Sequence, residues 1–202
     1  MKNVGILIFN DVEVLDFTGP FEVFSLAQDE KQNKIFNTFT IAETDGILKA
    51  RNGFLTKANF RMGNCPSIDI LLVPGGYGAE KVEINNKKVI NWLAITNKTT
   101  EITASICTGA FLLAKAGIIT NQAVTTHWLD IKELKKQFPN LNVLENVKYV
   151  DNGKIITSAG ISAGIDMSFH IVSKICGIHI AKNIARVMEY DWIKVNPAAA
   201  SI

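Results

Sequence analysis

The chain has 202 residues, of which 48% are hydrophobic and 20% charged, and its formal net charge at pH 7 is +2. Basic and acidic residues are nearly equal in number and the basic ones are scattered, so the sequence shows no basic patch of the kind that binds nucleic acid. No apolar run approaches the roughly 20 residues that a membrane-spanning helix needs. A chain of this size builds a sizeable core, so we expect one domain over residues 1–195 and a poorly ordered tail at 196–202.

Six short apolar runs predict β-strands, several of them apolar on both faces as in a parallel sheet covered by helices. They span residues 4–9, 39–42, 68–74, 101–106, 123–126 and 154–159. Segments with helical periodicity lie among them, at 19–28, 87–97, 108–117, 127–138, 162–177 and 179–190. Turn residues at 151–153 predict a hairpin. The alternation predicts an α/β fold with a doubly wound, mostly parallel sheet flanked by helices.

The three cysteines, Cys65, Cys107 and Cys176, are odd in number and match no zinc-binding spacing, which indicates free thiols in a reducing compartment. The short apolar run near the N-terminus is followed by acidic residues and not by a signal-peptide cleavage site. We therefore expect a cytoplasmic protein that acts on a small molecule, with no metal, no cofactor, no nucleic acid and no membrane partner.

Cys107 lies between a predicted buried strand and a predicted helix, at the edge of a parallel sheet where ligands bind. A nucleophile on such a strand–turn–helix elbow is exposed to substrate, and the helix N-terminus is expected to lower the pKa of the thiol. The alternative is a small buried hydrophobic residue, which is how most free cysteines behave. Cys65 and Cys176 lack this setting and are interpreted as structural.

Three further segments carry candidate site residues. In the segment 71–80, Gly75 and Gly76 follow a buried strand; with the amide of Thr108, the backbone here could form an oxyanion hole, or simply a tight turn. Asp16 follows an apolar pair just before a predicted helix, where it could act as a proton donor, although a helix cap at Asp16 or Thr18 is the favoured interpretation.

His127 follows the predicted strand 123–126 and could reach the same edge of the sheet as Cys107. A Cys–His pair is a common way to activate a thiol. The alternative is a structural histidine at the start of a helix. His170 and His179, which lie in the late helical segments, are interpreted as structural or exposed.

Taken together, five segments resemble the ThiJ/PfpI family of the class I glutamine-amidotransferase-like superfamily. They are LDFTGPFEVF (15–24), LLVPGGYG (71–78), SICTGAFLLAKAGI (105–118), TTHW (125–128) and SAGISAGIDMSFHIV (158–172). The resemblance covers nearly the whole chain and is closest to the isonitrile hydratase branch and to the sensor domain of certain AraC-type regulators. It implies a flavodoxin-like fold, usually as a homodimer.

The same resemblance implies Cys107 as the nucleophile and Asp16 as a catalytic acid, and it implicates Thr108. Thr108 stands where protease-like members of the family have a histidine, which weakens a peptidase interpretation. The late His-x-Glu pair of glutamine amidotransferases is absent, and no helix-turn-helix segment of the regulator type follows the similar region.

We therefore expect a cysteine-dependent enzyme that hydrates an isocyanide to an N-substituted formamide through a thioimidate, with the amides of Gly76 and Thr108 holding developing charge. An amidase, a protease-related enzyme or a glyoxalase-like enzyme could use the same cysteine. A non-enzymatic ligand or redox sensor is the other alternative.

Overall fold

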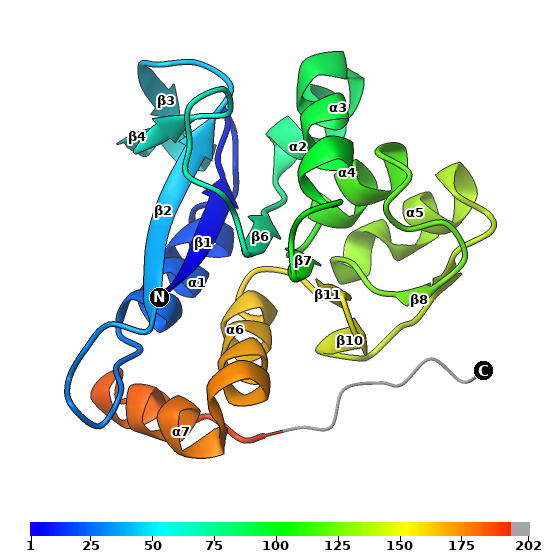
Figure 1. Ribbon diagram of the computed structural model, residues 1–202. Coiled ribbons are helices and arrows are strands. Elements are labelled where there is room, and N and C mark those ends of the chain that lie inside the picture. The colour runs from blue at the N-terminus through cyan, green and yellow to red at the C-terminus, as the bar shows by residue number, and fades with distance from the viewer. Residues whose placement is uncertain (195–202) are drawn as a thin grey trace.

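A seven-stranded sheet forms the centre of the protein, with the strand order β10–β11–β7–β6–β1–β2–β5 (Figure 1). The computed structural model describes residues 1–194. The strands of this sheet are β1 (Lys2–Leu7), β2 (Phe36–Ala42), β5 (Phe60–Arg61), β6 (Ile70–Val73), β7 (Ile102–Ser105), β10 (Tyr149–Asn152) and β11 (Ile155–Ser158).

All neighbouring strands of the main sheet are parallel except β10 and β11, which form the predicted hairpin. The order β2–β1–β6–β7–β11 is that of flavodoxin-like folds, so the topological switch point lies between β1 and β6. Ligands in such folds bind beyond the carboxyl ends of the strands at this point. The predicted fold class is therefore confirmed.

Over the described residues 1–194, seven α-helices surround the sheet. They are α1 (Val14–Ser25), α2 (Tyr77–Lys81), α3 (Lys87–Thr96), α4 (Gly109–Lys115), α5 (Ile131–Gln137), α6 (Ala163–Cys176) and α7 (Ile178–Val187). Helix α6 packs against α1 and α7, whereas α4 packs against α2 and α3. Figure 1 shows α6 and α7 on one side of the sheet and α3 and α4 on the other, so helices cover both faces.

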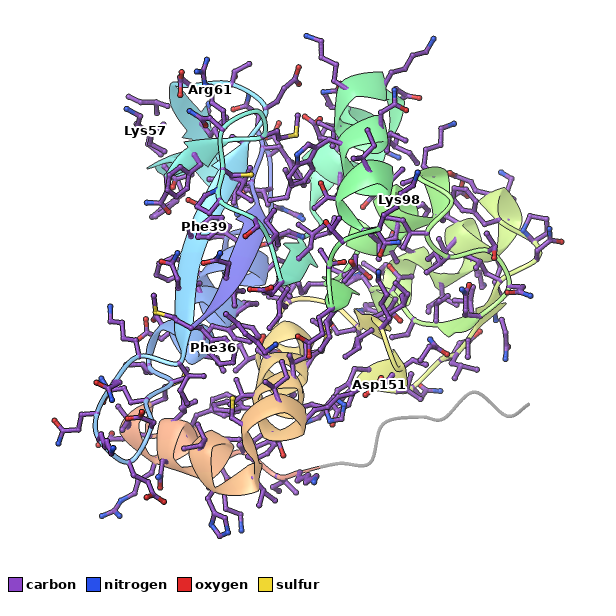
Figure 2. All side chains as sticks on the ribbon, viewed as in Figure 1. Phe36, Phe39, Lys57, Arg61, Lys98 and Asp151 are labelled. Atoms are coloured by element: carbon purple, nitrogen blue, oxygen red, sulfur yellow. The ribbon has the colours of Figure 1, made fainter. Side chains whose placement is uncertain are left out.

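Burial on both faces explains the apolar strands. Every residue of β6 and β7 is buried, as expected for central parallel strands. On β2, Phe36 packs edge-on against Phe24 of α1, and Phe39 packs edge-on against Phe60 of β5 (Figure 2). None of the helices described over residues 1–194 is long and apolar enough to cross a membrane.

Three short 3-10 turns and two small sheets complete the fold. The turns are η1 (Arg51–Gly53), η2 (Glu83–Asn85) and η3 (Trp128–Asp130). Strands β3 (Ile47–Lys49) and β4 (Leu55–Lys57) form an antiparallel hairpin around η1, which the sequence pattern did not predict. The predicted strand at 123–126 is shorter, β8 (Ala123–Val124), and pairs with β9 (Asn142–Val143) instead of joining the main sheet.

The first helix also differs from the prediction. It begins at Val14 and not near residue 19, so Pro20 lies inside it. Proline inside a helix removes one backbone hydrogen bond, and the apolar residues on both sides of Pro20 nevertheless keep the helix against the sheet and α6. The predicted tail at 196–202 lies outside the described residues.

Candidate active site

Cys107 lies on a strained turn between β7 and α4, as the sequence predicts. Its φ is 54°, in the left-handed region that costs a non-glycine residue roughly 1–2 kcal/mol. Two hydrogen bonds hold the turn: the Cys107 amide donates to the Ala159 carbonyl at 3.2 Å, and the Cys107 carbonyl accepts from the Thr126 hydroxyl at 2.8 Å. The strain is therefore supported by neighbouring segments, as at many functional sites.

Ile161 forms a second strained turn, after β11, with a φ of 54°. A β-branched residue in this region is an outlier. Hydrogen bonding from the backbone amides of Ile161 and Thr108 favours the anionic form of the Cys107 sulfur. Ile161 therefore supplies an anion-stabilising amide. Sequence analysis missed it, because an isoleucine after Ala-Gly carries no turn signal.

Asp16 lies in the first turn of α1 and is completely buried, with 0% of its surface exposed. Neither Asp16 nor Thr18 caps the helix. The capping position is Glu13, whose side chain makes no capping hydrogen bond, and the Thr18 hydroxyl donates to the Val14 carbonyl. The favoured capping interpretation is therefore wrong, because α1 begins earlier than predicted.

The Asp16 carboxylate faces the elbow. Its Oδ2 accepts a 2.9 Å hydrogen bond from the Gly75 amide, and Oδ1 is buried without a well-formed hydrogen bond among the described residues. Burial is the main cause that raises the pKa of Asp16 to about 7, and the amides of Gly75 and Ile161 offset only part of it. Asp16 can therefore hold or release a proton near neutral pH.

The glycine loop does not provide the predicted oxyanion hole. The Gly76 amide donates to Thr108 Oγ1 at 2.9 Å, so this amide is already used, and the Gly75 amide is used by Asp16. A Cβ on Gly75 would lie 2.4 Å from the Thr108 nitrogen, so glycine is required for this close approach. The loop therefore positions Asp16 and Thr108, and the amides near the sulfur come from Thr108 and Ile161.

The prediction of a lowered thiol pKa is also wrong. Burial raises the pKa of Cys107, and the nearby Asp16 carboxylate raises it further. The backbone amides of Thr108 and Ile161 lower the pKa of the thiol but do not outweigh these two effects. Because Asp16 ionises before Cys107, the site near neutral pH contains a thiol next to a carboxylate that is partly ionised.

The elbow opens into a cavity of about 460 Å³. Its wall includes Cys107, Thr108, Gly76 and His127, whereas the neighbouring Gly75 lies behind it against Asp16. The other lining residues are Glu13, Arg51, Asn52, Tyr77, Glu80, Leu129, Asp130 and Ile161. The cavity therefore brings the Cys107 sulfur, several charged groups and the apolar side chains of Leu129 and Ile161 into one space.

His127 also lines this cavity. Within the part of the chain that the structure describes, no hydrogen bond joins its imidazole to the Cys107 thiol. Its Nδ1 lies 3.2 Å from Asp130 Oδ2, so the imidazole is oriented by a carboxylate. Glu80, which sequence analysis missed, lies near Asp130 and Thr108; burial raises its pKa, and the Asp130 charge adds to this effect. The cavity thus has a second group of ionisable side chains, separate from Asp16.

Three aromatic residues near the motifs and the other two cysteines differ in their surroundings. Of the aromatic residues near the motifs, Tyr77 lines the cavity, whereas Phe17 is in the core and Trp128 is largely exposed. Cys65 and Cys176 are half-buried free thiols whose pKa is raised by burial. Over residues 1–194, no group of three or more His, Cys, Asp or Glu side chains is arranged to hold a metal ion.

Comparison with known proteins gives a consistent family match. The DJ-1/PfpI family model matches residues 2–174. Isonitrile hydratase of Pseudomonas putida is 26% identical over 187 residues, covering 93% of this chain and 78% of that protein. A ThiJ/PfpI family protein from Pseudomonas syringae has the same fold, with a TM-score of 0.83, 21% identity, and coverage of 98% of this chain and 78% of that one.

Transcriptional regulators are also similar. The HTH-type regulator GbdR of Pseudomonas aeruginosa is 20% identical over 193 residues. The match covers 96% of this chain but only 52% of the regulator, so this chain spans about half of that protein's length.

Proposed function

Because the chain belongs to the DJ-1/PfpI family, we propose that it is a cysteine-dependent enzyme that hydrates an isocyanide to an N-substituted formamide. The observation that carries this proposal is the buried pair of Asp16 and Cys107. The Asp16 carboxyl group, whose pKa is about 7, has one oxygen without a well-formed hydrogen bond and lies beside Cys107 on its strained turn. The similarity to isonitrile hydratase supports the choice of substrate class.

The first step adds the thiol to the terminal carbon of the isocyanide. The sulfur of Cys107 forms a bond to this carbon while Asp16 accepts the thiol proton and delivers it to the same carbon. The S–H bond breaks, an S–C and a C–H bond form, and the product is a thioimidate, R–N=CH–S–Cys. The amides of Thr108 and Ile161 stabilise negative charge on sulfur as it develops.

The second step hydrolyses the thioimidate. Asp16, again ionised, accepts a proton from a water molecule as the water oxygen attacks the imidate carbon, and it passes this proton to the nitrogen. The C–S bond of the resulting R–NH–CH(OH)–S–Cys then breaks while the hydroxyl proton moves, by way of Asp16, to the departing sulfur, which releases R–NH–CHO and restores the thiol. No oxidant, reductant or cofactor is needed, since the overall reaction is the addition of water.

The test is formamide production from a simple alkyl or aryl isocyanide by the wild type, Cys107→Ala and Asp16→Asn. We expect activity to be abolished in Cys107→Ala and to fall roughly 10²–10⁴-fold in Asp16→Asn, the usual contribution of a general acid or base. Cys176→Ala, which removes a half-buried thiol outside the cavity, is the matched control and should retain full activity. A folded wild type without turnover, or a fully active Cys107→Ala, would overturn the proposal.

A second candidate is a non-enzymatic ligand or redox sensor, which the similarity to GbdR favours. It requires selective oxidation of Cys107 by mild peroxide. The buried thiol with a raised pKa argues against this role, because susceptibility to oxidation follows thiolate character and exposure. Methylglyoxal and a simple amide, assayed beside the isocyanide, test the other enzyme alternatives.

A further inference from the structure

The β3–β4 hairpin brings a charged pair to the mouth of the cavity. Arg51 Nη1, in the turn η1, lies 3.0 Å from Glu13 Oε2, and both residues line the cavity. The Arg51 side chain is 52% exposed, whereas that of Glu13 is only 17% exposed. An ion pair at the surface contributes little to stability, so a charged pair at this position calls for another explanation.

The hairpin is fixed to the segment that precedes α1. The Arg51 amide donates to the Val12 carbonyl at 2.9 Å, and the Asp11 amide donates to the Lys49 carbonyl at 2.8 Å. Asn10 Oδ1 accepts a further bond from the Lys49 amide at 2.9 Å. The hairpin therefore holds Arg51 in one place relative to the start of α1.

Glu13 continues this chain of contacts to the acid. Its amide donates to the Gly75 carbonyl at 3.0 Å, and the Gly75 amide in turn donates to Asp16 Oδ2 at 2.9 Å. Glu13 is also the capping residue of α1, and its carbonyl accepts the Asp16 amide at 3.2 Å. Glu13 is thus one helical turn from Asp16 and connected to it through a single glycine.

The charges around Asp16 are few. The Glu13 carboxylate raises the pKa of Asp16 and the Arg51 guanidinium lowers it, and the Cys107 thiol lies on the elbow side. On α6, which packs against α1, the charged groups have other partners: Asp166 pairs with Lys148, and His170 and Lys174 pair with Asp151. Glu80, His127 and Asp130 face the cavity on the other side of the elbow.

We propose that Glu13 and Arg51 are positioning residues whose opposite charges control proton transfer between Asp16 and Cys107. Arg51 fixes Glu13 beside the start of α1, and the balance between the two charges sets how readily the acid holds its proton. This inference rests on the Asp16–Cys107 pair of the proposed function, but it does not depend on the identity of the substrate.

The test measures the alkylation rate of Cys107 by iodoacetamide against pH, by intact-protein mass spectrometry, in a Cys65→Ala/Cys176→Ala background. The ionised Asp16 carboxylate assists loss of the thiol proton, so we expect the rate to rise through an apparent pKa near 7. Arg51→Met should move this midpoint to higher pH and Glu13→Gln to lower pH, each by about half a unit or more, which is roughly a threefold change in proton affinity.

The matched control is Arg61→Met, because Arg61 is 51% exposed and pairs with Asp45 at 3.2 Å, outside the cavity. It should leave the midpoint unchanged, and Arg51→Lys, which keeps the charge, should restore most of the wild-type midpoint. Shifts in the same direction, or no shift in Arg51→Met and Glu13→Gln, would overturn the proposal. If Arg51→Met does not fold, the direction of the shift in Glu13→Gln decides.

The two proposals can fail separately. Opposite midpoint shifts in a protein that does not hydrate isocyanides would support the charge-balance inference and reject the hydratase function. Hydratase activity with midpoints that do not move would do the reverse.

Discussion

Asp16 is a fully buried aspartate and Asp151 a partly buried one, and their carboxyl groups behave in opposite ways. Asp16 is fully buried and its pKa is raised to about 7. The side chain of Asp151 is only 10% exposed, and its pKa is lowered to about 2. Burial disfavours the ionised form in both cases, so the smaller burial of Asp151 and its larger number of hydrogen-bond donors together account for the difference in pKa.

The Asp151 carboxylate accepts hydrogen bonds from three residues. It accepts from His170 Nε2 at 2.7 Å, from Lys174 Nζ at 2.9 Å through both oxygens, and from the Gly153 amide at 2.7 Å. Asp151 lies on the β10–β11 hairpin beside α6 (Figure 2). Its ring of donors ties that hairpin to the helix, and His170 is therefore structural, as the sequence suggested.

Among residues 1–194, Asp16 has one backbone donor at hydrogen-bond distance and no cation in an ion pair with it, and Arg51, whose charge lowers the pKa of Asp16, is itself paired with Glu13. The comparison teaches that an aspartate is structural where it keeps some contact with water and has cations around it, and is poised for proton transfer where it is fully buried and has none in contact. Three substitutions test this difference, from the largest expected effect to the smallest.

Asp151→Asn should reduce the free energy of unfolding by about 3 kcal/mol at pH 7, because it leaves Lys174 without its counter-charge and removes the acceptor of His170. The measurement is urea unfolding followed by circular dichroism. Asp45→Asn, at an ion pair whose carboxylate is 71% exposed, is the control and should have almost no effect. An Asp151→Asn protein as stable as the wild type would contradict the structural role.

Asp16→Asn should increase the free energy of unfolding, and the size of this increase should depend on pH. The folded pKa of about 7 lies above the ordinary aspartate value of 3.8, so the contribution of Asp16 to stability is fully present below about pH 4 and is lost as pH rises through 7. The variant does not titrate and so does not lose this stability. A pKa shift of this size limits its gain in the free energy of unfolding at pH 8 to about 4 kcal/mol, and we expect a gain of roughly 2 kcal/mol.

Urea unfolding of both proteins at pH 4.5 and pH 8 measures this gain, and the difference between them should be small at the lower pH. A difference that is equal at the two pH values would mean that Asp16 does not titrate in this range.

Lys174→Met should have the smallest effect, a loss of about 1 kcal/mol, because Lys174 is 36% exposed and Asp151 keeps its bonds to His170 and Gly153. Lys182→Met, at an exposed position of α7, serves as the control in the same unfolding experiment. A loss as large as that of Asp151→Asn would mean that one cation, and not the number of donors, holds Asp151 ionised.

The sequence allowed much of the fold to be predicted. Parallel strands covered on both faces give continuous apolar runs, and the runs at 68–74 and 101–106 correspond to β6 and β7. The short edge strand β5 and the β3–β4 hairpin were missed, because each strand has only two or three residues and the exposed positions include apolar Ile47 and Leu55, so apolar and polar residues do not alternate.

The candidate site was predicted less completely. Cys107 and its strained turn followed from the position of a cysteine at a strand–helix junction, and the importance of Asp16 came from the family resemblance. The use of the Gly76 amide by Thr108, the amide of Ile161 near Cys107 and the charge pair at Glu13 depend on contacts between residues 32 to 54 positions apart. No local pattern encodes such contacts.

The double attachment of Gly75 has a consequence for motion. Its carbonyl accepts from Glu13 and its amide donates to Asp16, so the first turn of α1 is joined to the end of β6 at both ends of one residue. Fraying of that turn would break both bonds together, so the start of α1 and the glycine loop at Gly75 should open as one cooperative unit. Deuterium uptake at the Gly75 amide should therefore slow as Asp16 ionises, because a carboxylate is the stronger acceptor.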